Sequence, residues 1–306
     1  MSETHLDHRG LIRALSPEQR IALTRKSDWR GLAHLALHAG AILLLGGLIL
    51  ARVPGWPLLM IAQGILIVFL FTLLHETSHR TAFETIWINK VVAALCGFLI
   101  ALPPEWFRNF HFEHHRHTQN PEKDPELATP QPSSLVGYAL HVSGLPVWRS
   151  HIRTLLRNAV GRCADSFVPR SARDQVRSEA QVMLLAYAGL AVLSVALSST
   201  ALLFVWVLPA LLGQPFLRLY LMAEHGRCPA VANMFENSRT TFTNWLTRKI
   251  AWNMPYHAEH HAFPAVPFFR LPEWHALTRA HLQVTETGYA RFHTKVIAAL
   301  SRKANA

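Results

Sequence analysis

Long stretches without a formal charge constrain this chain more than any other feature. Residues 56–74 contain no Asp, Glu, Lys or Arg, and residues 35–51 form another such stretch just before them. A helix of this length, at about 1.5 Å per residue, approaches the roughly 30 Å thickness of a bilayer core. A third uncharged stretch, residues 182–216, is too long for one crossing and contains the polar residues 198–200. The sequence therefore predicts spans over about 35–51, 56–74, 182–198 and 200–217.

The connections between these stretches predict how the spans pair. Arg52, Pro54, Gly55 and Pro57 form a short turn between the first two, and residues 198–200 divide the last two. Residues 91–104 are apolar over a length that suits a re-entrant or interfacial element rather than a span. We expect an all-α integral membrane protein with four transmembrane helices in two hairpins. A helical cap, residues 75–180 and 223–306, completes a single domain over residues 1–306.

The charges predict on which side of the membrane the cap lies. Only 16% of the residues are charged, against about 25% in soluble domains. The formal net charge is +11, and of the 30 Lys and Arg residues only Arg52 lies in a turn within a hairpin. The positive-inside rule then places both termini and the cap in the cytoplasm. Basic blocks between apolar runs favour anionic lipid as the partner over nucleic acid. Residues 1–32 hold no apolar stretch of signal-peptide length, so we expect no cleaved presequence.

Histidine is the unusual residue, with 19 copies in three clusters and scattered positions. Residues 75–79 read HETSH, residues 111–115 read HFEHH and residues 257–261 read HAEHH. Spacings of three and four residues place imidazoles on one face of a helix. His225 follows the fourth predicted span as His75 follows the second. Nine histidines can therefore meet at the membrane surface: His75, His79, His111, His114, His115, His225, His257, His260 and His261.

This number of imidazoles predicts two metal ions. Imidazole suits zinc, copper, iron and nickel, and one tetrahedral zinc uses at most four protein ligands. The three cysteines form no close pair, so a thiolate zinc site or a disulfide framework is not indicated. Two imidazole-rich metals beside apolar helices favour oxygen activation on a hydrophobic substrate, because hydrolysis needs only one metal and a water.

The three boxes resemble those of the membrane fatty acid desaturases and, more broadly, of the histidine-box desaturases and hydroxylases. The resemblance extends to residues 111–118, to Ala223-Glu224-His225-Gly226 and to residues 256–264. It implies a di-iron centre held by the nine histidines, with two iron ions that use dioxygen and two electrons to remove hydrogen from an unactivated C–H bond. Leu221 stands where some acyl-CoA members carry Asn, and Glu224-His225 is similar to an element of membrane alkane hydroxylases. Desaturation and hydroxylation therefore both remain open.

Some of the remaining polar residues are expected to support the metal ligands, and others are expected to lie outside the site. Acceptors for the ligand imidazole N–H groups fix their orientation, and the candidates are Glu76, Glu113, His117, Asp124, Glu224, Asn253 and Glu259. His34 and His38 lie in the first span and are interpreted as packed or interfacial residues. The remaining histidines are expected at the surface: His5, His8, His141, His151, His275, His281 and His293.

Substrate and electrons must come from outside the chain. No iron–sulfur cysteine cluster, nucleotide-binding glycine loop or haem domain is visible, so we expect an external donor of the ferredoxin, rubredoxin or cytochrome type. The basic residues Arg149, Arg153 and Arg157 suit an acidic donor or lipid headgroups equally. A lipid-linked acyl chain is the expected substrate, and a carotenoid, a sterol-like lipid or an alkane are alternatives.

Two other functional classes compete. His75-Glu76-x-x-His79 is also the pattern of zinc metalloproteases, in which the Glu is the general base. That reading leaves the two three-histidine boxes without a role. A transporter or metal-binding protein is the other alternative, but transport sites usually lie near the bilayer midplane. The boxes here lie near the ends of the predicted spans.

Overall fold

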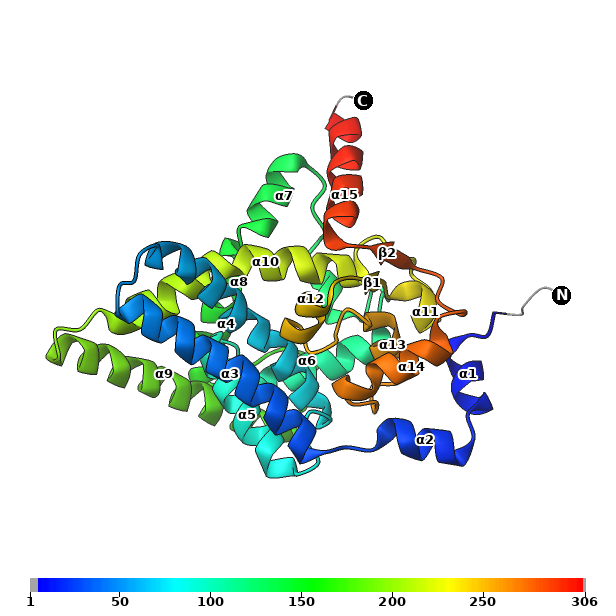
Figure 1. Cartoon of the computed structure of the whole chain (residues 1–306), viewed down its shortest axis with the longest axis horizontal. Helices are drawn as coiled ribbons and strands as arrows, with labels where there is room; N and C mark the ends of the chain where they lie inside the picture. The colour runs from blue at the N-terminus through cyan, green and yellow to red at the C-terminus, as the bar shows by residue number, and fades with distance from the viewer. Residues whose placement is uncertain (1–4, 305–306) are drawn as a thin grey trace.

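Helices make up most of the computed structural model, which describes residues 5–304 (Figure 1). The outermost residues of the predicted domain, 1–4 and 305–306, lie outside the described residues. The first half contains the helices α1 (His8–Ala14), α2 (Pro17–Thr24), α3 (Asp28–Leu50), α4 (Trp56–His79), α5 (Ile86–Leu99), α6 (Pro104–His117), η1 (Pro125–Ala128), α7 (Leu135–Val142) and α8 (Leu145–Ala159).

The second half is also mainly helical. Its elements are η2 (Arg170–Ala172), α9 (Arg173–Ala196), η3 (Leu203–Val207), α10 (Leu208–His225), α11 (Met234–Asn237), β1 (Thr240–Phe242), α12 (Trp245–Ile250), α13 (His257–Ala262), η4 (Phe268–Arg270), α14 (Leu271–Thr278), β2 (Thr285–Thr287) and α15 (Tyr289–Ala304). The strands β1 and β2 pair in parallel and form the only sheet among residues 5–304.

Four helical segments are long and apolar enough to cross a membrane, as the sequence predicts. They contain α3, α4, α9 and η3 with α10. Two of them continue past the uncharged stretches, because α4 ends only at His79 and α10 only at His225. The first box and His225 therefore lie in the last turns of these helices. Each histidine is thus held by a long, rigid element.

Glycine lets α4 and α10 approach each other closely. A Cβ atom on Gly64 would lie 2.0 Å from the carbonyl oxygen of Pro209, and one on Gly213 would lie 2.2 Å from the carbonyl carbon of Gly64. Nearby, Gln63 Nε2 donates a hydrogen bond to Val205 O at 3.0 Å, within the π-helical turn η3. The close contact places the ends of α4 and α10, with their histidines, side by side.

A sharp bend directs α6 toward the end of α4. The axes of α5 and α6 differ by 100°, and α6 begins at Pro104 with Pro103 as the residue before it. Proline suits the first position of a helix and cannot continue the preceding one. Helix α9 contacts both sides of the bend: Tyr187 Oη donates to Phe98 O at 2.6 Å, and Glu179 Oε2 accepts from Glu105 N at 2.9 Å.

The third box lies on a buried core in the C-terminal part of the chain. All six residues of α13 are buried. Trp252, Phe268 and Trp274 are among the largest fully buried side chains, and Trp274 Nε1 donates to Glu259 O at 3.1 Å. Helices α7 and α15 project from the body of the molecule (Figure 1).

Several scattered histidines have packing roles. His38, which the sequence analysis interprets as packed, accepts a hydrogen bond from Trp252 Nε1 at 3.1 Å, and His34 Nε2 lies 2.8 Å from Lys249 O. The expectation that His8 and His293 are surface residues was wrong, because both are buried. His8 contacts Asn233, and His293 Nε2 lies 2.8 Å from Leu219 O. These two residues attach α1 and α15 to the body, through contacts between segments distant in sequence.

Candidate metal centre

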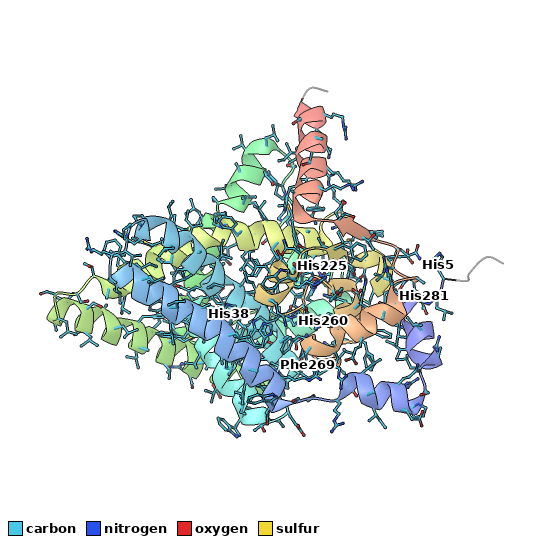
Figure 2. The ribbon with its side chains drawn as sticks, viewed as in Figure 1. His5, His38, His225, His260, Phe269 and His281 are labelled. Carbon is cyan, nitrogen blue, oxygen red and sulfur yellow. The ribbon has the colours of Figure 1, made fainter. Side chains whose placement is uncertain are left out.

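The nine predicted ligands come from four helices and converge in the interior. Helix α4 carries two of them, α6 three, α10 one and α13 three. All are buried except His79 and His115, which are partly buried. Figure 2 shows His225 and His260 in the centre of the molecule, whereas His5 and His281 lie at its edge.

The first group contains five histidines. Donor nitrogens of His75, His79, His111, His115 and His260 all lie within 4.8 Å of one another. The Nε2 atoms of His79 and His111 are 2.8 Å apart, and His260 Nε2 lies 3.2 Å from His79 Nε2 and 3.3 Å from His115 Nε2. Helices α4, α6 and α13 thus direct their rings at one point.

The second group lies beside the first. It contains His114, His225 and His261, whose donor atoms are also within 4.8 Å of one another. His114 Nε2 lies 3.1 Å from His225 Nε2. The ninth residue, His257, joins this group through His225, since their Nε2 atoms are 2.8 Å apart.

The arrangement of the donor nitrogens suits metal binding better than hydrogen bonding between the rings. Both ring nitrogens of His75 and Nε2 of His261 are buried without a hydrogen-bond partner among residues 5–304, and such burial costs free energy. Nitrogens at 2.8–3.3 Å match the about 3 Å that separates adjacent ligands bonded at about 2.1 Å. Burial and the neighbouring imidazoles lower the pKa of His257 and His260 well below the ordinary value, which favours the neutral rings that metal ions bind.

Three of the seven supporting candidates face the clustered histidines. Asp124 Oδ1 lies 2.9 Å from His114 Nδ1, and Glu224 Oε1 lies 3.3 Å from His257 Nδ1. Glu76 Oε1 is more distant, 3.9 Å from His260 Nδ1. Of the three carboxylates only Asp124 forms a hydrogen bond with its histidine, and a partner at Nδ1 directs Nε2 toward a metal. The Nδ1 atoms of His257 and His260 have no hydrogen-bond partner among residues 5–304.

The other four candidates face away from the two groups. Glu113 contacts Arg116 and His117, Asn253 donates to Phe268 O, and Glu259 contacts His275 and Thr240. Helical geometry explains both glutamates, because each follows a box histidine by two residues and so points to another face. The same contact with Glu113 keeps His117 out of the groups.

The structure adds contacts that the sequence analysis did not identify. Thr118 Oγ1 lies 3.2 Å from His261 Nδ1, and Asn237 O lies 3.2 Å from His225 Nδ1. Glu126 Oε2 lies 3.1 Å from His114 Nε2. The contact of Asn237 is made by its backbone carbonyl, so the identity of its side chain could not have indicated it. The position of Glu126 two residues after Asp124 is the one sequence feature that would have pointed to it.

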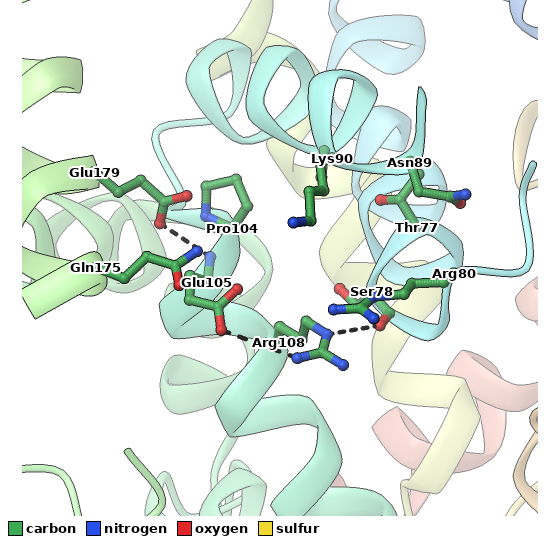
Figure 3. A pocket seen from close by; sticks show the side chains of 11 residues that line it. Thr77, Ser78, Arg80, Asn89, Lys90, Pro104, Glu105, Arg108, Gln175 and Glu179 are labelled. Atoms are coloured by element: carbon green, nitrogen blue, oxygen red, sulfur yellow. Dashed lines mark hydrogen bonds and ion pairs between the residues drawn. The ribbon is translucent and has the colours of Figure 1, made fainter. Parts of the chain in front are cut away.

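A basic cavity lies behind the first box, at the end of α4 (Figure 3). Arg80, Lys90 and Arg108 are among its lining residues. Arg108 Nε donates to Ser78 O at 3.1 Å, and its guanidinium lies 4.5 Å from the ring centroid of Phe112. Arg108 therefore connects the last turn of α4 to α6, and with it the first box to the second.

Comparison with known proteins identifies the family to which this constellation belongs. The model of the fatty acid desaturase family matches residues 51–295. The chain belongs to the fatty acid desaturase family. This match covers all three boxes and His225, so it contains every residue of the two groups.

Individual relatives are more distant. A sphingolipid delta(4)-desaturase/C4-monooxygenase of Mus musculus is 27% identical over 207 residues, 65% of this chain and 58% of the relative. A sphingolipid delta(4)-desaturase of Drosophila melanogaster is 28% identical over 253 residues, 77% of this chain and 71% of the relative. The dihydrorhizobitoxine desaturase of Bradyrhizobium elkanii is 27% identical over 254 residues, 77% of this chain and 70% of the relative.

These similarities bear on the functional class. They extend over 58 to 71% of the length of the three relatives. The names of the relatives are those of oxidoreductases, and they support a desaturase or a hydroxylase. The metalloprotease alternative, drawn from His75, Glu76 and His79, finds no support among them. The family and the histidine groups together indicate a metal centre.

Proposed function

We propose that this protein is a membrane di-iron oxidase that desaturates the acyl chain of a lipid. The observation that carries the proposal is the convergence of nine imidazoles, in two adjacent groups, at the ends of apolar helices. Two iron ions bound there would supply, with dioxygen, the oxidising power needed to remove hydrogen from an unactivated C–H bond. Desaturation consumes one dioxygen, two electrons and two protons, and yields one alkene and two waters.

The protein residues position this chemistry. Asp124 Oδ1 lies 2.9 Å from His114 Nδ1 and so directs Nε2 of that ring into the site, and Glu224 Oε1 lies 3.3 Å from His257 Nδ1. Helices α4 and α10 are apolar along most of their length and carry histidines in their last turns. An acyl chain in the bilayer beside these helices is thus presented to the histidine groups without leaving an apolar environment.

We propose the topology that the charge distribution favours. Helices α3 and α4 form one hairpin, and α9 and α10 the other. The remaining elements form a cytoplasmic cap within a single domain, and both termini lie on the same side. Arg52 is the single Lys or Arg residue in the two hairpin turns, and this distribution supports the arrangement. Reporter fusions at Arg52 and in the loop after α6 test it, because the account requires opposite sides for the two sites.

Hydroxylation is the second candidate reaction. It is favoured by the name of the mouse relative, which includes a C4-monooxygenase, and by the Glu224-His225 pair. Insertion of oxygen consumes the same dioxygen, electrons and protons, and yields one alcohol and one water. Both reactions begin with hydrogen removal from carbon, so the same histidine groups serve either.

Lipid mass spectrometry separates the two reactions. Cells that express the chain are compared with cells that express His260→Ala, a variant that removes one imidazole from the first group. Desaturation is expected to give lipids that have lost two hydrogens, and hydroxylation lipids that have gained one oxygen. Identical lipid profiles in the two cell types would contradict the proposed function.

An external protein must deliver the electrons. We propose a donor of the ferredoxin, rubredoxin or cytochrome type. Arg149 and Arg153 on α8 are exposed and able to attract an acidic donor or lipid headgroups, whereas Arg157 is engaged with Asp165. Activity with the native donor that falls with rising ionic strength would favour docking of the donor on α8.

A further inference from the structure

We propose that Glu126 supplies a carboxylate ligand to the second histidine group. This inference rests on the proposed di-iron function and adds to it a residue that belongs to none of the histidine boxes. Glu126 lies in η1, after the loop that follows α6. Its Oε2 atom lies 3.1 Å from His114 Nε2, the distance that also separates His114 Nε2 from His225 Nε2. The carboxylate oxygen thus contacts a donor nitrogen of the group at the same distance as a neighbouring ring nitrogen does.

Asp124 fixes both partners of this contact. Its Oδ1 atom lies 2.9 Å from His114 Nδ1 and also accepts a hydrogen bond from Glu126 N at 2.9 Å. Its Oδ2 atom accepts from Gln119 N at 2.8 Å. One buried carboxylate therefore orients the His114 ring and the turn that carries Glu126 at the same time.

The protons of the histidines are already engaged on the other side of the rings. His114 Nδ1 faces Asp124, and His225 Nδ1 faces Asn237 O at 3.2 Å. In both rings Nε2 is thus the nitrogen that points into the second group. His114 Nε2 lies 3.1 Å both from His225 Nε2 and from Glu126 Oε2, which is about one ligand–ligand distance. A metal ion bound by His114 Nε2 is therefore within reach of the Glu126 carboxylate.

The number of ligands supports the same conclusion. The first group has five histidines, whereas the second has three and gains a fourth through His257. Glu126 brings the second group to five donors. Carboxylate joins imidazole in many non-haem iron sites. The two irons would then differ, one in a set of nitrogens only and the other in a mixed set.

The Glu126 side chain is exposed at the edge of the second group, so it can be substituted without disturbing the core. The Glu126 side chain is 43% exposed, whereas the His114 side chain is 4% exposed. The second group is therefore open to solvent on the side of Glu126. Substitution of an exposed side chain leaves the core intact, so Glu126→Gln is expected to fold. It keeps the shape of the side chain and removes its negative charge.

The test uses the full-length, iron-loaded protein and measures iron per chain after a chelator challenge. We expect the unsubstituted protein to keep both irons and Glu126→Gln to lose one. Glu126→His, which offers a nitrogen in place of the oxygen, is expected to restore retention. Glu122→Gln is the matched control, because Glu122 is an exposed acid of the same loop. Mössbauer spectra of the unsubstituted protein are expected to show two unequal iron sites.

The possible failures can be told apart. Two irons retained in Glu126→Gln, with an unchanged Mössbauer spectrum, would overturn the role of Glu126 and leave the di-iron function intact. An unsubstituted, active protein without two irons would overturn the proposed function, and the role of Glu126 with it. If Glu126→Gln does not fold, Glu126→Asp replaces it. That variant keeps the charge but shortens the reach, and it must also lose one iron.

Discussion

The imidazole rings of His115 and His261 stack face to face, with centroids 4.0 Å apart and planes inclined by 5°. His115 belongs to the first histidine group and His261 to the second. Each has a neighbour in sequence that belongs to the opposite group, His114 and His260 respectively. Successive residues of a helix point about 100° apart. The two His-His pairs therefore divide between the groups, and the stacked rings are where the groups meet.

Alanine variants of the paired histidines test this division. His115→Ala and His260→Ala each remove one donor from the first group, and we expect both to abolish turnover, because the iron is lost or misplaced. His281→Ala is the control, since this residue lies at the edge of the molecule (Figure 2). Product formation per chain, measured with equal protein amounts, checks the prediction. Full activity in either variant would exclude that residue as a ligand.

Asp124→Asn tests the orientation of His114. The amide keeps the shape of the carboxylate but lacks its charge, so it holds the Nδ1 proton of His114 less strongly. Loss of such a partner costs about 10- to 100-fold in metal affinity or activity. Iron titration of the variant is the measurement, with Glu122→Gln as a control in the same loop. An affinity equal to that of the unsubstituted protein would show that His114 needs no fixed acceptor.

Gly64→Val tests the contact between α4 and α10. A Cβ atom at this position would collide with Pro209 O, so the helices must separate. Overpacking of this kind typically costs about 1–3 kcal/mol. We expect a lower melting temperature in detergent together with weaker iron retention. Gly47→Ala is the matched control, because a Cβ atom on Gly47 meets nothing within 4 Å. Equal melting temperatures for Gly64→Val and this control would contradict the predicted role of the contact.

Arg108→Lys tests the connection between the first and second boxes. Lysine keeps the charge but has neither the Nε donor to Ser78 O nor a planar group to lie over Phe112. We expect reduced iron retention and reduced activity. Lys90→Met removes another cation from the same cavity and is expected to have little effect. A comparable loss of iron and activity in both variants would show that the charge of the cavity is important and that the contacts of Arg108 with Ser78 and Phe112 are not.

Local patterns were sufficient to predict the helical framework. The uncharged stretches correctly predicted four apolar helices, and the polar residues 198–200 correctly predicted the break between the last two. Spacings of three and four residues also selected eight of the nine histidines that the structure brings together, and the position of His225 after the fourth predicted span selected the ninth. Such spacings depend only on the geometry of a single helix.

Contacts between distant segments were not predictable from these patterns. Glu113 and Glu259 were selected because they lie within the boxes, yet helical geometry turns both away from the histidine groups. His8 and His293 are buried against segments far away in sequence. Glu126 faces His114 only because the loop after α6 folds back on that helix. Each of these positions depends on packing rather than on periodicity.

Metal analysis of the purified, active, full-length protein tests the central proposal most directly. We expect two irons per chain, and activity that is lost when iron is removed and regained when iron is restored. A single zinc per chain in fully active protein, without iron, would contradict it.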